Sequence, residues 1–299
     1  MYGWGNVFYL NAVSKYITVN IVLGMGITLF LGGILNILNL AHQSTIDIIF
    51  LIGLVLFILK IYKSRDYSYR PKLINKENKS YFLTLLPITL LIISIISSIN
   101  PDSYNYHDDF QKYFVHPIKM LETGSVFGST LGAIGRETFG GQAYFQSFYI
   151  SWLGLRAINI FDSVFCLSLC TLLIIEQGIK QKTLTFGILV SCLLILIHPQ
   201  FVNISSIYSG ILFMLASIVL MLELFSYRHS LNFSQIKIIF GISLCFASLI
   251  SLKTTYGLFS GFFYMLIIII IYFSRSFTKN FIYFIFITPA LSLIFATPW

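Results

Sequence analysis

Charged residues are scarce in this chain of 299 residues, and their scarcity limits the class of protein it can be. Only 10% of the residues are charged and 57% are hydrophobic, and the mean hydropathy is +0.85. Soluble globular domains carry roughly 25% charged residues. A chain with so few charges cannot cover a water-facing surface, so the composition excludes a soluble protein and predicts one that lies in a lipid bilayer.

Features of several other protein classes are also missing. The four cysteines all lie within apolar stretches, without histidine or carboxylate neighbours, so they indicate neither a disulfide framework nor a zinc site. The glycine-rich stretch 124–141 has no Walker motif and no dinucleotide fingerprint, and we interpret it as a flexible connection. The net charge of +8 comes from basic residues between apolar segments, which is typical of cytoplasmic loops and not of a nucleic-acid surface.

Nine stretches are apolar and long enough to cross a bilayer as helices, which takes roughly 20 residues each. We therefore predict an all-α polytopic membrane protein with a single transmembrane domain over 1–299. It divides into two amino-terminal spans with a basic loop (17–80) and a core (81–299) that includes a long loop at 100–142. The nine predicted spans are approximately 17–40, 45–61, 81–99, 157–175, 184–200, 204–225, 238–252, 256–273 and 281–297.

The distribution of basic residues predicts the orientation of these spans. Residues 60–80 hold seven Lys and Arg residues, and the connectors 176–183, 226–237 and 274–280 are basic as well. Cytoplasmic loops carry such an excess of Lys and Arg. Alternation along the chain then places the loop 100–142 outside and the amino terminus inside. We expect a protein of the bacterial inner (plasma) membrane with its functional site on the extracytoplasmic side.

The outer loop 100–142 carries five of the eleven acidic residues of the chain. Within it, apolar side chains recur at spacings of four, four and three residues, which predicts an amphipathic helix lying on the membrane surface. These side chains are Phe110, Phe114, Ile118 and Leu121.

The paired acids Asp108 and Asp109 stand just before this predicted helix. One interpretation is a solvated cap, since carboxylates suit a helix amino terminus. The other is a catalytic pair, in which one carboxylate is the general base for an acceptor hydroxyl and the other orients it or binds a divalent cation such as Mg²⁺ or Mn²⁺. His107, directly before the pair, is a candidate hydrogen-bonding partner of a substrate.

Lys253 interrupts an apolar run at the outer end of a span. Its side chain can snorkel to the membrane interface, or it can bind a lipid phosphate as a point charge. Arg136 is a weaker candidate for the same phosphate. His198, at another outer helix end, is a candidate for lining the same cavity or for a structural cap. Asp162 is the one acid well inside a span. Asn159, three residues earlier, is a candidate to satisfy it by a hydrogen bond, and the sequence leaves a structural and a functional role for Asp162 equally open.

The acidic loop resembles a known pattern. The run Tyr106-His107-Asp108-Asp109-Phe110, Tyr113 three residues later and Glu122-Thr123-Gly124 after a surface helix resemble the first outer loop of the GT-C superfamily of membrane glycosyltransferases. The closing Thr297-Pro298-Trp299 resembles the Pro-Trp that ends a later span in many bacterial members. The resemblance covers the topology from about residue 81 to 299. The two spans before residue 81 depart from members that open directly with the span before the acidic loop, which leaves the acceptor open.

The resemblance implies an inverting transfer of a sugar from a polyprenyl-phosphate donor to a glycan, lipid or protein acceptor. Asp109 or Asp108 would deprotonate the acceptor hydroxyl, and Lys253 would stabilise the leaving phosphate. Tyr113 matches the spaced tyrosine of the pattern and would contact substrate. Family members usually continue with further spans beyond the position of Trp299, so we expect this sequence to be partial.

Two other classes of function are compatible with the sequence. A transporter or flippase for a lipid-linked saccharide would need a polar pathway at the bilayer midplane, where only Asp162 is a candidate. A noncatalytic membrane scaffold would fit everything except the gathering of acids in the outer loop.

Overall fold

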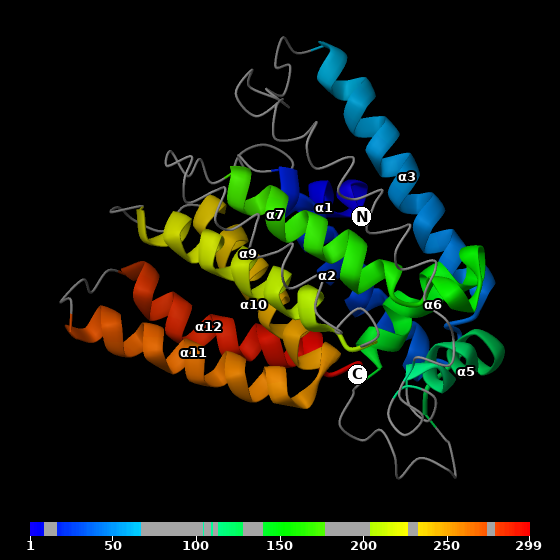
Figure 1. Ribbon diagram of the computed structural model, residues 1–299. Helices are drawn as coiled ribbons and strands as arrows, with labels where there is room; N and C mark the ends of the chain where they lie inside the picture. Colours follow the sequence, from blue (N-terminus) through cyan, green and yellow to red (C-terminus); the bar gives the residue numbers. More distant parts are fainter. Residues whose placement is uncertain are drawn as a thin grey trace.

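The computed structural model describes residues 1–8, 17–66, 104, 109, 113–127, 140–176, 204–226, 233–273 and 279–299. Every regular element within these residues is a helix, as Figure 1 shows. The prediction of an all-α protein is confirmed for this part of the chain.

Within the described residues, four helices are long and apolar enough to cross a membrane: α2 (Ile17–Ile37), α3 (Gln43–Asp66), α9 (Ile207–Ser226) and α10 (Phe233–Leu252). Shorter apolar stretches lie in a π-helix, η4 (Ile160–Cys166), that continues into α7 (Leu167–Glu176), and in α11 (Thr254–Phe273) and α12 (Lys279–Ala296). These helices coincide with predicted spans. The spans predicted at 81–99 and 184–200 lie outside the described residues.

The remaining helices are short. They are α1 (Tyr2–Phe8), α5 (Val115–Thr123), α6 (Gly141–Leu153) and a single 3-10 turn, η3 (Leu155–Ala157). Sequence patterns did not reveal α1, which packs between α2 and α3 through its glycines. The helix α5 lies within the stretch predicted to form an amphipathic helix, and its place on the membrane surface stays a prediction. Its buried residues are Pro117 and Met120, whereas Ile118 and Leu121 are half-buried, so the buried face is rotated from the predicted one.

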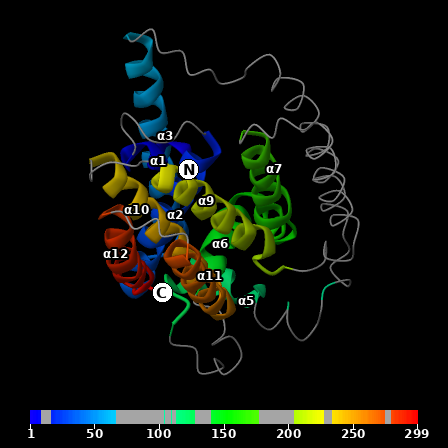
Figure 2. The ribbon, with the colours of Figure 1, turned by 90° about the vertical axis from the view of Figure 1, so that its left-hand side faces the viewer.

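The helix α10 packs against α2, α9, α11 and α12. Figure 2 shows it beside α2 and α12. Its contact with α2 is close because Gly26 has no side chain: a Cβ there would lie 2.8 Å from Cγ of Leu244. Small residues at such contacts are typical of helix packing in membranes.

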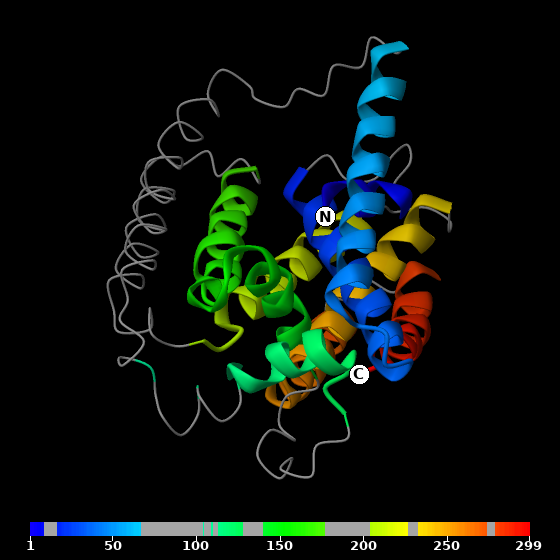
Figure 3. The same cartoon turned by 90° about the vertical axis from the view of Figure 1, so that its right-hand side faces the viewer.

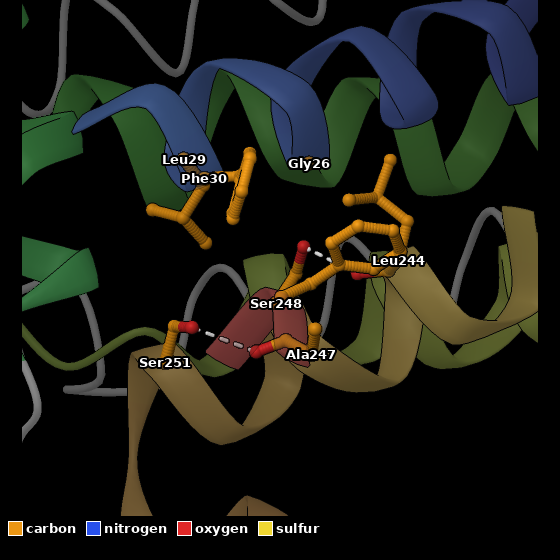
Figure 4. Close-up of a pocket in the computed structure, with 8 residues that line it drawn as sticks. Gly26, Leu29, Phe30, Leu244, Ala247, Ser248 and Ser251 are labelled. Carbon is orange, nitrogen blue, oxygen red and sulfur yellow. Dashed lines mark hydrogen bonds between the residues drawn. The ribbon is translucent and has the colours of Figure 1, made fainter. Parts of the chain in front are cut away.

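A small crevice remains between α2 and α10, shown in Figure 4. It has no room for a water-sized molecule. Ser248 Oγ donates to the Leu244 carbonyl at 2.8 Å and Ser251 Oγ to the Ala247 carbonyl at 2.7 Å, so both hydroxyls are satisfied within their own helix. The crevice is a packing feature with no polar group available to a ligand.

The helix α3 is the least enclosed of the long helices. Figure 3 shows it rising away from the rest of the bundle. Only 17% of its apolar segment Gln43–Tyr62 is buried, whereas 78% of the segment Gln235–Leu252 in α10 is buried. Since its exposed side chains are mostly apolar, as at Leu51, Val55 and Ile58, α3 presents a surface suited to lipid.

Helix ends that the charge pattern predicts on one side of the membrane do meet in the structure. At one end, the backbone N–H of Ala41 donates to the Gly124 carbonyl at 2.9 Å, which joins the turn between α2 and α3 to the end of α5. At the opposite end, the backbone N–H of Thr18 donates to the Glu176 carboxylate at 3.1 Å, where the carboxylate caps α2. The grouping of ends agrees with the predicted alternation, and which end faces outward remains a prediction.

Candidate functional site

The first of these two ends is where the predicted site residues gather, and we call it the acidic-loop end. It comprises the turn 38–42, the described residues of 104–127, the amino terminus of α6, the start of α9, the turn at Lys253 and the carboxyl terminus at Trp299. A Cβ at Gly140 would lie 3.0 Å from the Trp299 ring, and one at Gly141 would lie 2.7 Å from the Ser251 carbonyl oxygen. These short separations hold the start of α6 against the ends of α10 and α12.

The helix α5 is fixed at this end by a set of local bonds. The Asp109 carbonyl accepts from the Phe114 N–H at 2.9 Å just before α5 begins. Gly124 ends α5 with φ of 77°, a left-handed conformation that glycine adopts without strain, and its N–H donates to the Met120 carbonyl. Lys119 Nζ donates to the carbonyls of Val126 and Phe127. These bonds hold α5 and the described residues on either side of it in place.

Asp109 is only 4% exposed, so it is not the solvated cap that one interpretation of the sequence offered. It lies near Tyr104, whose hydroxyl accepts from Asn159 Nδ2 at 3.3 Å. Burial raises the pKa of Tyr104, and the negative charge of Asp109 raises this pKa further. Tyr104 therefore keeps its proton at neutral pH and can donate a hydrogen bond.

An apolar cluster surrounds this tyrosine and links it to α9. Tyr104, Phe114, Ile158 and Ile204 form the cluster, with Tyr113 and Ile150 packed against it. The rings of Tyr104 and Phe114 meet edge to face with centroids 5.2 Å apart. Tyr113 is half-buried at the edge of this cluster, and its contact with a substrate stays a prediction.

Two glutamines of α6 reach the same place. Gln142 and Gln146 are 4% and 3% exposed, and the Nε2 atoms of both donate to the Ile204 carbonyl. Among the described residues, no group donates to either Oε1 atom, and the buried Ser206 hydroxyl also has no partner there. Three buried polar groups are thus available around residues 204–206.

Lys253 is the single residue between α10 and α11. Its N–H donates to the Leu249 carbonyl at 3.3 Å and its carbonyl accepts from Tyr256 N–H at 3.0 Å, so the turn is tight. The side chain is half-buried, and its ammonium has no hydrogen-bond or ion-pair partner among the described residues. One turn later, Tyr256 donates its hydroxyl to the Ser206 carbonyl at 3.0 Å, which brings Lys253 to the start of α9.

Asp162 has the structural one of the two roles that the sequence left open. Its carboxylate accepts from the N–H groups of Tyr208 and Ser209 at 3.0 and 2.8 Å and from Ser209 Oγ at 2.7 Å. Asn159, the candidate partner from the sequence, donates its amide to the Tyr104 hydroxyl at 3.3 Å. Asp162 caps α9 from another element, where the helix dipole favours a negative charge.

Of the predicted site residues, the structure describes Asp109, Tyr113 and Lys253: Asp109 is buried, Tyr113 packs against the cluster around Tyr104, and Lys253 forms the turn between α10 and α11. Asp108, His107, Arg136 and His198 lie outside the described residues, so their predicted roles stay predictions. Among the residues that the structure describes, no three His, Cys, Asp or Glu side chains are placed to hold a metal ion. Asp109 is the one carboxylate described in the acidic pair, and we derive no step through a metal.

Sequence reasoning missed several polar residues of this end, namely Tyr104, Gln142, Gln146, Ser206 and Tyr256. One signal was available for the glutamines: they stand four residues apart in an otherwise aromatic and apolar helix, which places them on one face. Nothing in the sequence indicated that Ile204 would supply their shared acceptor.

Comparisons with known proteins assign no family to the chain. No protein-family model matches it, and neither curated proteins nor solved structures gave a match.

Proposed function

We propose that the protein is an inverting membrane glycosyltransferase of the GT-C type, which moves a sugar from a polyprenyl-phosphate donor to an acceptor on the outer face of the membrane. The observation that carries the proposal is the placement of Asp109: a carboxylate that is 4% exposed, at a bundle end that also holds Lys253, a half-buried lysine whose ammonium has no partner among the described residues. Buried carboxylates of this kind are costly and are typical of functional sites.

The chemistry needs one base and one cation. Asp109, or Asp108 beside it, takes the proton from the acceptor hydroxyl as its oxygen attacks the anomeric carbon. The bond from that carbon to the phosphate oxygen breaks on the opposite face, so the configuration inverts and polyprenyl phosphate leaves. General bases of this kind contribute about 10²- to 10⁴-fold to the rate.

Lys253 suits the leaving phosphate. Its ammonium has no competing acceptor among the described residues, and the tight turn between α10 and α11 holds its backbone in place. A fixed cation aimed at developing negative charge stabilises a transition state more than a ground state. A lipid-linked donor also suits a chain whose helices are long and apolar enough for a bilayer.

A transporter of a lipid-linked saccharide is the alternative. It would use polar groups at the bilayer midplane, and Asp162 was the candidate from sequence. Because both carboxylate oxygens of Asp162 accept hydrogen bonds from the start of α9, this residue is occupied in holding the fold. No other residue in the described part of the chain gives this alternative specific support.

The experiment that tests the proposal separates transfer from transport. The purified full chain is reconstituted in liposomes with radiolabelled prenyl-phosphate hexoses and with membrane extracts as the source of acceptor. Label that moves to an acceptor, with an inverted anomeric configuration, supports the enzyme. Intact donor that moves between leaflets without cleavage would contradict it and favour the transporter.

A further inference from the structure

We propose that Gln142, Gln146 and Ser206 form a subsite that recognises hydroxyl groups of the transferred sugar. This inference rests on the proposed function, because it names what the same bundle end binds. It begins from three buried polar groups that the fold leaves without partners among the described residues.

The orientation of the two amides is fixed by their shared acceptor. A carbonyl oxygen only accepts hydrogen bonds, so the Nε2 atoms of Gln142 and Gln146 must face the Ile204 carbonyl, and their Oε1 atoms must face away from it. Spacing of four residues on α6 puts both side chains on one face. The result is two amide oxygens without a donor among the described residues, on side chains that meet at Ile204, two residues before Ser206.

Folding alone does not account for this pair. A buried amide oxygen without a donor costs free energy, and apolar side chains of similar size would avoid that cost. The other buried hydroxyls of the bundle show the alternative, since Ser243, Ser248 and Ser251 all donate to carbonyls of their own helix. A ligand that supplies donors would remove the cost at Gln142 and Gln146.

The chemistry of the three groups selects the kind of ligand. Amide oxygens accept from O–H groups and repel anions, so they suit the neutral ring hydroxyls of a sugar and not its phosphate. The phosphate belongs at Lys253, which the Tyr256–Ser206 bond places next to the same segment. The donor would therefore lie with its phosphate toward Lys253 and its hydroxyls toward α6.

Binding to the full chain in lipid nanodiscs tests the subsite directly. The probes are farnesyl phosphate alone and farnesyl phosphate linked to glucose, galactose, mannose or N-acetylglucosamine. For at least one of these sugars we expect binding about tenfold or more tighter than for farnesyl phosphate, the size of one hydrogen-bonded group. Equal affinity for all probes would overturn the inference and leave the amide oxygens to water.

Variants then assign the preference to these side chains. The double variant Gln142→Leu, Gln146→Leu should bind farnesyl phosphate as the native chain does and lose the preference for the sugar. The single variant Gln146→Met, which conserves volume, should reduce the preference and serves if the double variant does not fold. The control is Gln235→Leu, a glutamine 2% exposed at the start of α10, away from this end, and it should keep the preference.

Two outcomes decide between the subsite and the proposed function. A double variant that retains the full sugar preference would overturn the subsite, whatever its transfer activity. A native chain that binds the sugar through Gln142 and Gln146 but transfers it to no acceptor would leave the subsite standing and contradict the glycosyltransferase proposal.

Discussion

Buried polar side chains behave differently in two parts of this bundle. In the crevice between α2 and α10, Ser248 and Ser251 are satisfied by carbonyls one turn back in the same helix. At the acidic-loop end, Gln142 and Gln146 are equally buried, yet their Oε1 atoms have no donor in the described part of the chain. Burial of a polar side chain is therefore not by itself the mark of a functional residue. The mark is a buried donor or acceptor atom that has no hydrogen-bond partner in the described part of the chain.

The two buried aspartates differ in what they contact. Asp162 receives three hydrogen bonds from Tyr208 and Ser209 and works as a cap. Asp109 lies near Tyr104, in the loop that precedes α5, and its negative charge raises the pKa of that tyrosine.

The largest effect is expected at Asp109. Asp109→Asn removes the base and barely changes size, so sugar transfer should fall by about 10²- to 10⁴-fold while expression and membrane insertion stay native. The measurement is the reconstituted transfer assay. Sugar transfer at the native rate in this variant would show that the role of Asp109 is structural.

Asp162→Ala should act on folding. It leaves two N–H groups at the start of α9 without their acceptor, and hydrogen bonds to a charged group contribute about 1.5–3 kcal/mol each. We expect the free energy of unfolding to fall by about 3 kcal/mol, as measured by denaturant titration in detergent. Thr171→Ala, which removes a bond within α7 only, is the control and should cost far less. Equal losses would contradict the capping role.

Lys253→Gln should weaken use of the donor about tenfold through the Michaelis constant, without changing the unfolding midpoint, because the side chain has no described partner to lose. Lys253→Arg should restore part of the loss, since it restores the charge. Lys237→Gln, on α10 away from this end, is the matched control. A variant with native donor use would show that Lys253 only snorkels.

The smallest effect is expected in the crevice. Ser248→Ala removes a bond within α10 and should change the free energy of unfolding by less than about 0.5 kcal/mol, with native transfer. Thermal unfolding and the transfer assay measure the two quantities. A large loss of transfer here would mean that the crevice, and not the acidic-loop end, holds the site.

Much of the fold could be predicted from the sequence because a helix that crosses a membrane needs a long, apolar stretch of residues, which the sequence shows directly. The helices α2, α3, α9 and α10 follow the predicted spans closely, and the pairing of helix ends follows the charge alternation. The helix α1 escaped prediction, because seven residues with two glycines carry no span signal and are stabilised by packing on α2 and α3.

The site could be predicted only in part. Asp109 stood out as one of two paired acids in the outer loop, Tyr113 through the family resemblance, and Lys253 as a cation at the outer end of a span. That these residues share one substrate site stays a prediction. The roles of Tyr104, Asn159 and Ser206 did not stand out, because they depend on contacts between distant segments, such as the 3.3 Å bond from Asn159 to Tyr104. The spacing of residues along the sequence shows which side chains share a face of a helix. It does not show which distant segments contact each other.

The central claim is that the acidic-loop end faces the outside of the cell, and single-cysteine labelling tests it most directly. In a chain without its native cysteines, cysteine is placed at Leu38, which is 57% exposed in the turn tied to α5, and at Asn75 in the basic loop. A membrane-impermeant maleimide added to intact cells should label position 38 and spare position 75 until the membrane is opened. Labelling of position 75 alone would contradict the account.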